Sequence, residues 1–265
     1  MAVATYLDRI VAAHRRAAAT DGRPLEDLHQ AAAAAPPTRG FAAALAAGHR
    51  LGVIAEVKRR SPSRGELAPG LDPAALATSY HAGGAAALSV LTDAEFFGGS
   101  AADLAGARRA CPLPVLRKDF TVGPRDVLDA RIMGADAVLL IVAALGDREL
   151  PELVGLAAEV GLDALVEVHD GAEADRALAA GATLVGVNQR DLTTFEVDHD
   201  LARRLRSRLG HDTVTVAESG IHGPGDAQRL ADAGYHAVLV GEALVTSADP
   251  AGAVRGLAPA ARVRT

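Results

Sequence analysis

Charged and polar side chains follow several short apolar segments of the sequence, and their types suit proton transfer. Glu56 and Lys58 end one such segment, Lys118 ends a second, Glu167 a third and Asn188 a fourth. A carboxylate and an ammonium group that lie close together shift each other's pKa, which suits them to act as base and acid. Structural ion pairs or solvated loop charges would explain any one of these residues. They explain the whole set poorly, because charged side chains are almost never buried unless they are paired.

Two later segments end in glycine and suggest a site for an anion. Ser219-Gly220 follows one segment, and Gly241-Glu242 follows the next, where a short helix could begin. Glycine lets an anion approach the backbone, and N–H groups at the start of a helix favour negative charge. These residues therefore predict a phosphate site, with the Glu242 carboxylate pointing away from the phosphate.

Eight short segments rich in β-branched residues are the expected strands that position these groups. They run from Gly52 to Val57, Ala86 to Leu91, Pro114 to Lys118, Ala137 to Val142, Ala164 to Val168, Leu184 to Val187, Thr213 to Ala217 and Ala237 to Val240. Period-two alternation places Glu56 and Lys58 on one face of the first strand.

Helical patterns alternate with these strands. They cover Pro73 to Ala82, Ala101 to Ala110, Asp126 to Met133, Arg148 to Val160, Ala172 to Ala180, His199 to Leu209 and Gly225 to Ala233, and several end at a glycine. Eight strand–helix units predict an α/β fold, a (β/α)8 TIM barrel, in which chemistry lies at the carboxyl ends of the strands. An open eight-stranded sheet is the alternative. It would normally show a glycine-rich nucleotide turn after the first strand, and the sequence has none there.

The first 50 residues differ from the rest and read as Ala-rich helices broken by Gly and Pro, the first over Met1 to Thr20. We therefore expect a single TIM-barrel domain over residues 1–265, with an N-terminal helical extension over 1–50 and the barrel over 51–265.

Composition narrows the choice of partners and compartment. The formal charge of −6 predicts no binding to nucleic acid or to an anionic membrane surface, and a single cysteine fits a reducing, cytoplasmic compartment. The most apolar stretch, Ala135 to Leu145, is too short to cross a bilayer.

The nine histidines show no spacing typical of metal ligands, so we expect no metal, and His169 is interpreted as structural. The chain shows no evident apolar outer stripe, so a monomer is predicted.

Several sequence strings occur together and carry a resemblance to a known family. They are VIAEVKRRSPSRG (Val53 to Gly65), FFGGS (Phe96 to Ser100), PVLRKDF (Pro114 to Phe120), ADAVLLIVAAL (Ala135 to Leu145), LVEVH (Leu165 to His169), GVNQRDL (Gly186 to Leu192), VAESGI (Val216 to Ile221) and VLVGEAL (Val238 to Leu244). In this order they resemble indole-3-glycerol-phosphate synthase of tryptophan biosynthesis, and they cover the chain from about Leu51 to Leu244.

The resemblance implies a reaction and assigns roles. The substrate would be 1-(2-carboxyphenylamino)-1-deoxyribulose 5-phosphate, and ring closure would release carbon dioxide and water without a cofactor or metal. Lys118 matches the family's favoured general acid, and Lys58 matches the second lysine, which contacts the substrate anion. Glu167 matches the base for dehydration, and Glu56 would keep the lysines charged. The order in which the two lysines donate stays open.

The resemblance also implies the substrate contacts. Ser61 would contact the anthranilate carboxylate, and Asn188 and Arg190 would orient the substrate and Glu167. Phe97, Phe120 and Leu139 match the family's apolar pocket for the aromatic ring. The phosphate cradle is matched by Ser219, Gly220, Gly241 and Glu242. Some family members have Ser at the last position, so only the backbone N–H of Glu242 is assigned. Gln189 departs from the Asn or small residue expected there, a change that could slightly alter the loop.

Two other functions fit the same fold. A phosphate-binding isomerase of the phosphoribosylanthranilate or histidine-pathway type would lack the two-lysine arrangement of Lys58 and Lys118. A non-catalytic sugar-phosphate-binding barrel would have lost Glu56, Lys58, Lys118 or Glu167, and all four are present. The synthase is therefore the function that the sequence favours.

Overall fold

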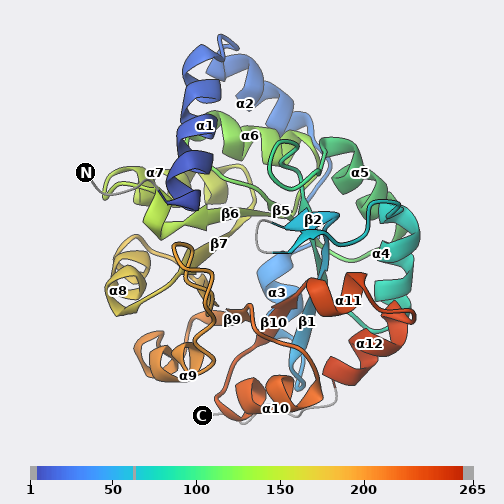
Figure 1. Ribbon diagram of the computed structural model, residues 1–265. Helices are drawn as coiled ribbons and strands as arrows, with labels where there is room; N and C mark the ends of the chain where they lie inside the picture. Colours follow the sequence, from blue (N-terminus) through green and yellow to red (C-terminus); the bar gives the residue numbers. More distant parts are fainter. Residues whose placement is uncertain (1–4, 62–63, 259–265) are drawn as a thin grey trace.

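The computed structural model describes residues 5–61 and 64–258, and within them eight parallel strands close into a barrel (Figure 1). The strands are β1 (Gly52–Val57), β4 (Ala87–Leu91), β5 (Val115–Lys118), β6 (Ala137–Ile141), β7 (Asp163–Val168), β8 (Leu184–Asn188), β9 (Val214–Glu218) and β10 (Ala237–Val240). Strand β1 pairs in parallel with both β4 and β10, which closes the ring. The predicted (β/α)8 barrel is confirmed, and closure excludes the open sheet.

Helices cover the outside of the ring of strands. They are α4 (Pro73–Ala82), α5 (Ala101–Ala110), α6 (Pro124–Ile132), α7 (Glu149–Glu159), α8 (Gly171–Ala179), α9 (Leu201–Leu205), α10 (Pro224–Asp232), α11 (Glu242–Val245) and α12 (Pro250–Leu257), with short 3-10 turns η1 (Val142–Ala144) and η2 (Arg206–Arg208). Gly134 and Gly234 adopt positive φ angles of 88° and 85° and end α6 and α10, as expected of glycine after a helix.

One predicted helix is shorter than the pattern suggested. The pattern covers His199 to Leu209, whereas α9 begins at Leu201 and changes to the 3-10 turn η2 at Arg206. The Asp198 side chain accepts a hydrogen bond from the N–H of Asp200, 3.0 Å away, and this local turn competes with the first helical turn.

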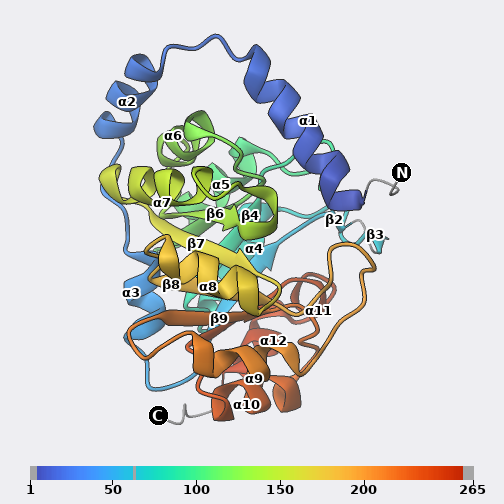
Figure 2. The ribbon, with the colours of Figure 1, turned by 90° about the vertical axis from the view of Figure 1, so that its left-hand side faces the viewer.

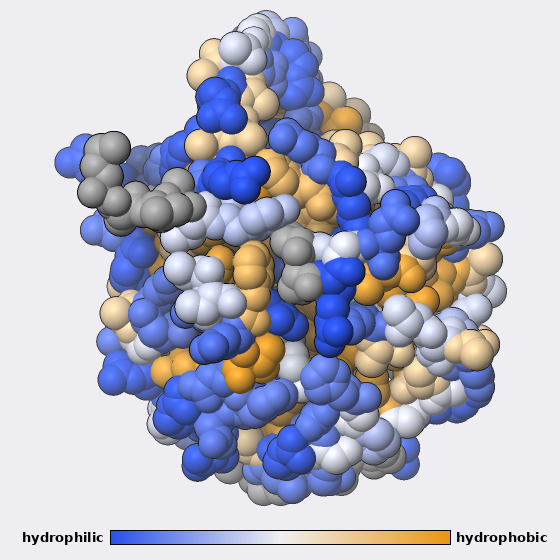
Figure 3. Space-filling view, viewed as in Figure 1, coloured by the Kyte–Doolittle hydropathy of each residue, from blue (hydrophilic) through white to orange (hydrophobic). Residues whose placement is uncertain are grey.

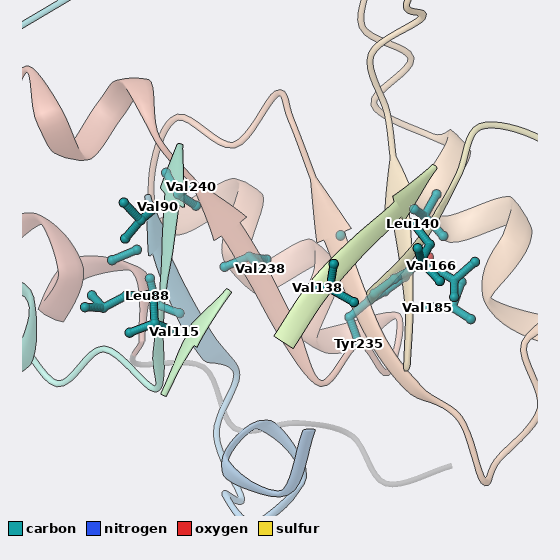
Figure 4. Close-up of a cluster of buried hydrophobic side chains, with 14 of the residues drawn as sticks. Leu88, Val90, Val115, Val138, Leu140, Val166, Val185, Tyr235, Val238 and Val240 are labelled. Carbon is teal, nitrogen blue, oxygen red and sulfur yellow. The ribbon is translucent and has the colours of Figure 1, made fainter. Parts of the chain in front are cut away.

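The strands divide the core into two layers by simple alternation. Along β1, Ile54 packs inside the barrel, while Val53 and Ala55 pack among the outer apolar side chains. Figure 4 shows part of the outer layer, including Leu88 and Val166. Because the inward-facing positions meet at the strand ends, the same alternation directs Glu56 toward the barrel interior.

Among the described residues from Thr5 onward, three helices precede the barrel: α1 (Tyr6–Thr20), α2 (Leu25–Ala34) and α3 (Phe41–Ala46). Phe41 and Leu45 of α3 are fully buried in the same cluster as Ile54, and the Ala42 N–H donates to Asp163 at the amino end of β7. Helix α3 therefore closes the amino end of the barrel. Figure 2 shows it at the left, with the β2 (Arg60–Ser61) and β3 (Gly65–Glu66) hairpin at the opposite end.

The predicted first helix agrees with α1 from Tyr6 onward, and residues 1–4 lie outside the described part. Thr5 caps α1, because its hydroxyl accepts the Asp8 N–H and the Asp8 carboxylate accepts the Thr5 N–H. In the part of the chain that the structure describes, no helix has the length and apolar character needed to span a membrane.

Candidate active site

A cavity opens at the carboxyl ends of the barrel strands, and every site residue predicted from the sequence lines it. These residues are Glu56, Lys58, Ser61, Phe97, Lys118, Phe120, Leu139, Glu167, Asn188, Arg190, Ser219, Gly220, Gly241 and Glu242. The face shown in Figure 3 is mostly hydrophilic, and apolar surface is visible between the hydrophilic residues. The structure thus gathers the predicted groups in one place, while their individual roles stay predictions.

The floor of the cavity is a group of ionisable side chains: Glu56, Lys58, Lys118, Glu167 and Glu218. The Lys118 Nζ lies 3.0 Å from Glu167 Oε2 and 3.5 Å from Glu218 Oε2. The Lys58 Nζ lies 2.5 Å from Glu56 Oε1. The side chains of Glu56, Glu167 and Glu218 are each no more than 5% exposed, whereas those of Lys58 and Lys118 are 17% and 16% exposed. The carboxylates are therefore shielded from solvent, and the lysines remain accessible from the cavity.

For the floor residues Lys118 and Glu167, burial and ion pairing shift the pKa in opposite directions. Burial alone would lower the pKa of Lys118, but the carboxylates of Glu167 and Glu218 outweigh it and raise that pKa. Burial would raise the pKa of Glu167, yet Lys118 and His169 hold it well below its usual range. The resting floor therefore contains a charged lysine beside an ionised Glu167, an acid and a base in contact.

Asn188 fixes the position of Glu167. Its Nδ2 donates to Glu167 Oε1 at 3.0 Å, and its Oδ1 accepts hydrogen bonds from the Ser219 hydroxyl at 2.8 Å and from the Arg190 N–H at 3.1 Å. These partners allow one orientation of the amide, with nitrogen toward Glu167. The guanidinium of Arg190 donates in turn to the Phe195 carbonyl at 2.8 Å.

His169 lies behind Glu167 and does not line the cavity. Its Nε2 is 3.3 Å from Glu167 Oε1, and its Nδ1 is 3.0 Å from Glu173 Oε2. Burial would lower the pKa of His169, but Glu167 and Glu173 raise it to about 10. The interpretation of His169 as structural agrees with this position, since the charged ring supports Glu167 from the side away from the cavity.

The aromatic wall of the cavity consists of Phe97, Phe120, Leu139, Tyr6 and Ile10. The rings of Phe97 and Phe120 lie 6.1 Å apart between centroids, a distance at which aromatic pairs attract. Leu139 lies on β6, and Tyr6 and Ile10 come from helix α1. This wall can bury a flat aromatic ring beside the charged floor.

The expected phosphate cradle lies between the ends of β9 and β10. Ser219 and Gly220 adopt positive φ angles of 66° and 70°, and α11 begins immediately after Gly241. A Cβ at position 220 would collide with Val197 and His199, and the positive φ there also favours glycine, whereas a Cβ at position 241 would displace the Glu56 carboxylate. The Glu242 carboxylate pairs with Arg64 at 3.3 Å, as needed if only its N–H is to face an anion.

Comparison with known proteins identifies the family. The family model described as indole-3-glycerol phosphate synthase matches residues 7–257. The chain belongs to this family. It is 53% identical over 243 residues to "Indole-3-glycerol phosphate synthase 2" of Streptomyces coelicolor, covering 92% of each chain, and 59% identical over 203 residues to the indole-3-glycerol phosphate synthase of a Nocardioides species, covering 77% of this chain and 78% of that one.

A more distant structural neighbour shares only the fold. The thiamine phosphate pyrophosphorylase of Pyrococcus furiosus superposes with a TM-score of 0.59 at 19% identity, covering 78% of this chain and 93% of that one. At that identity the likeness supports the barrel architecture alone.

Glu218 is a residue of this synthase-family site that ends a predicted strand in the sequence but was assigned no role there. It ends β9 with a side chain 3% exposed, and Gly186 leaves the space that it fills. Burial, only partly offset by Lys118, raises its pKa to about 8. The signal was present, because Glu218 ends its strand as Glu56 and Glu167 end theirs.

Helix α1 is the other part of the site that was not expected. Tyr6, Leu7 and Ile10 line the cavity, and Ile10 is only 2% exposed. The Tyr6 ring also meets Phe96 and Phe195 edge-on, at 6.0 and 5.7 Å between centroids. The pattern of residues 1–50 predicts helices but gives no sign of where they dock.

Proposed function

We propose that the protein converts 1-(2-carboxyphenylamino)-1-deoxyribulose 5-phosphate into indole-3-glycerol phosphate, with release of carbon dioxide and water, as a carboxy-lyase of tryptophan biosynthesis. The observation that carries this proposal is the contact of Lys118 with Glu167, 3.0 Å apart, at a cavity that also has an aromatic wall. A ring closure followed by dehydration needs an acid and a base beside an aromatic ring.

Ring closure begins when the ring carbon that bears the carboxylate attacks the ketone carbon. Negative charge develops on the ketone oxygen, and Lys118 donates a proton to it. Loss of carbon dioxide then restores the aromatic ring. Lys58 would contact the substrate anion and is the second proton donor available, while Glu56 balances its charge at 2.5 Å.

Dehydration then forms the indole. The hydroxyl left by the first step departs as water after a second protonation, and Glu167 removes a proton from the neighbouring methylene carbon. Two protons reach oxygen and one leaves carbon, so each turnover of the ionised substrate consumes one proton from solvent. Because Glu167 lies 3.0 Å from Lys118, the proton that it takes can return to the lysine.

The acid step prepares the base step. The positive charge of Lys118 lowers the pKa of Glu167, so Glu167 is a weak base while the lysine is charged. Once Lys118 has given up its proton that charge is gone, and burial then favours protonation of the carboxylate. This order keeps Glu167 ionised until the methylene proton must be removed.

The remaining contacts are assigned to binding. Ser61 would meet the anthranilate carboxylate, Arg190 and Asn188 would orient the substrate, and the aromatic wall would bury its ring. The cradle of Ser219, Gly220, Gly241 and the N–H of Glu242 would hold the phosphate. No cofactor is needed for this chemistry, and we further propose a single-domain, cytoplasmic monomer.

Direct assay tests the proposal. Purified protein mixed with the substrate in metal-free buffer is expected to form the indole chromophore and release one equivalent of carbon dioxide per product. Phosphoribosylanthranilate, the substrate of one isomerase with this fold, is the control and should remain unchanged. Saturable binding of the first substrate without any product would contradict the proposed activity.

A further inference from the structure

His14 joins the N-terminal helix to the barrel at the aromatic wall. It lies on α1, one turn after Ile10, with a side chain 20% exposed. Its Nε2 is 2.9 Å from Asp93 Oδ2 and 3.9 Å from Asp119 Oδ1. The ring also lies 5.5 Å from the Phe120 ring between centroids. The proposed mechanism gives none of these contacts a role.

Asp93 connects His14 to the loop that contains Phe97. The aspartate follows β4, and its side chain is 5% exposed. One carboxylate oxygen faces His14, while the other accepts the backbone N–H groups of Phe96, at 2.6 Å, and Phe97, at 3.1 Å. The imidazole and the Phe97 backbone therefore bind opposite sides of one carboxylate.

Asp119 makes the corresponding connection to Phe120. It follows Lys118 at the end of β5, and its Oδ1 accepts the Phe120 N–H at 2.8 Å. Its Oδ2 accepts from Arg117 at 3.0 Å and from the Thr92 hydroxyl. Asp119 is thus saturated by protein donors.

We propose that His14 is a positioning residue for substrate binding: by pairing with Asp93 and Asp119, its charged ring docks α1 on the two loops that hold Phe97 and Phe120 and so sets the aromatic wall. The proposal rests on the proposed function, because it concerns the pocket for the aromatic ring. The contacts of His14 on α1 would then affect the affinity for the substrate and not the rate of the chemical step.

The electrostatic surroundings of His14 favour its charged form. Burial would lower its pKa, but the hydrogen bond to Asp93 and the charges of Asp119 and Asp126 raise it above the usual value. Asp119 also pairs with a cation, Arg117, at 3.0 Å. Because the pKa of His14 is raised, the pairing is complete at low pH and is lost as the pH rises through that value.

The test compares His14→Gln with Arg15→Ala across a pH series. Arg15, the next residue on α1, binds Glu149 at 2.8 Å and does not line the cavity, so its loss weakens docking without touching the two loops. At about pH 6 the KM of H14Q should exceed the wild-type value about tenfold, the size of one hydrogen bond to a charged group, with kcat within about twofold. The ratio should fall toward one as the pH rises past the raised pKa of His14, and R15A should keep the wild-type KM at every pH.

Three results would overturn the proposal. A wild-type KM in H14Q at low pH would remove His14 from substrate binding. An equal rise of KM in R15A would mean that His14 acts only by docking α1 on the barrel, without a specific effect on the two loops. If chelation of wild-type protein reproduced the H14Q effect, a metal ion rather than an ion pair would join these three side chains, whose ligating atoms lie within 4.8 Å of one another.

Failure of the proposed function is distinguishable from failure of this inference. A non-reacting substrate analogue, with the ketone reduced to an alcohol, keeps the aromatic ring and the phosphate. If the wild type binds the analogue without turning over the substrate, the activity fails, but the dissociation constants of wild type and H14Q still decide the role of His14.

Discussion

On the cavity floor, Lys118, Glu167 and Glu218 come from the ends of buried strands, whereas on the aromatic wall Phe97, Phe120 and Ile10 come from loops and from α1. The barrel ladder pairs Glu167 and Glu218 with neighbouring strands on both sides, and it pairs Lys118 with Leu91 of β4. The wall depends on a few side-chain contacts, such as that of His14 with Asp93. We infer that the floor determines kcat and that the wall determines KM.

The largest effect short of removing Lys118 is expected at the base. Glu167→Gln keeps the shape and the hydrogen bond to Asn188 but loses basicity, so kcat should fall about 10²- to 10⁴-fold. Because only dehydration needs this base, carbon dioxide should be released before any indole forms, which rapid-quench measurement can show. Equal slowing of both products would place Glu167 in the first step instead.

A smaller loss of activity is expected when a floor side chain is displaced but not removed. In Gly241→Ala the new Cβ would collide with the Glu56 carboxylate and displace it from Lys58. Displacement of a catalytic group by about 1 Å can cost about 10²-fold in rate, which kcat/KM would report. Gly155→Ala on α7 is the matched control, since a Cβ there meets nothing within 4 Å. Full activity in G241A would show that the floor tolerates such movement.

The pH dependence of stability tests the burial of the floor. Glu218 has a pKa raised to about 8, so its contribution to the free energy of unfolding is complete at acid pH and is lost as the pH rises toward and through 8. Glu218→Gln imitates the protonated side chain and should unfold less readily than wild type above that pH. Denaturant titrations at acid and alkaline pH measure this, and parallel curves for the two proteins would contradict a buried, protonated Glu218.

The smallest effect is expected at Arg15, which lines neither the floor nor the wall. Arg15→Ala removes an ion pair whose side chains are 43% and 38% exposed, so the free energy of unfolding should fall by about 1 kcal/mol or less. Activity should not change. A large loss of stability would mean that α1 docks mainly through Arg15 rather than through its apolar face and His14.

The floor could be predicted from sequence because strand alternation and strand ends are local properties. Glu56, Lys58 and Lys118 follow apolar segments whose bounds agree with the strands to within one residue. Glu218 could have been included on the same grounds. The resemblance then supplied roles that no spacing could give, such as that of Ser61.

The wall could be predicted only in part. Phe97 and Phe120 were assigned through the resemblance, but Tyr6 and Ile10 were not, because the amphipathic pattern of α1 shows which face is buried and not what it is buried against. The contact of His14 with Asp93 joins residues 79 positions apart in sequence. Such long-range docking depends on tertiary packing, which a single sequence does not reveal.

The most direct test of the central claim is a paired measurement on Lys118→Met, of kcat for the substrate and of the dissociation constant of the non-reacting analogue. If the floor performs the chemistry, kcat falls by about 10² to 10⁴ while analogue affinity stays within about tenfold of wild type, because the aromatic wall and the phosphate cradle remain. A variant that binds poorly but turns over at the wild-type rate would contradict the account and make Lys118 a binding residue.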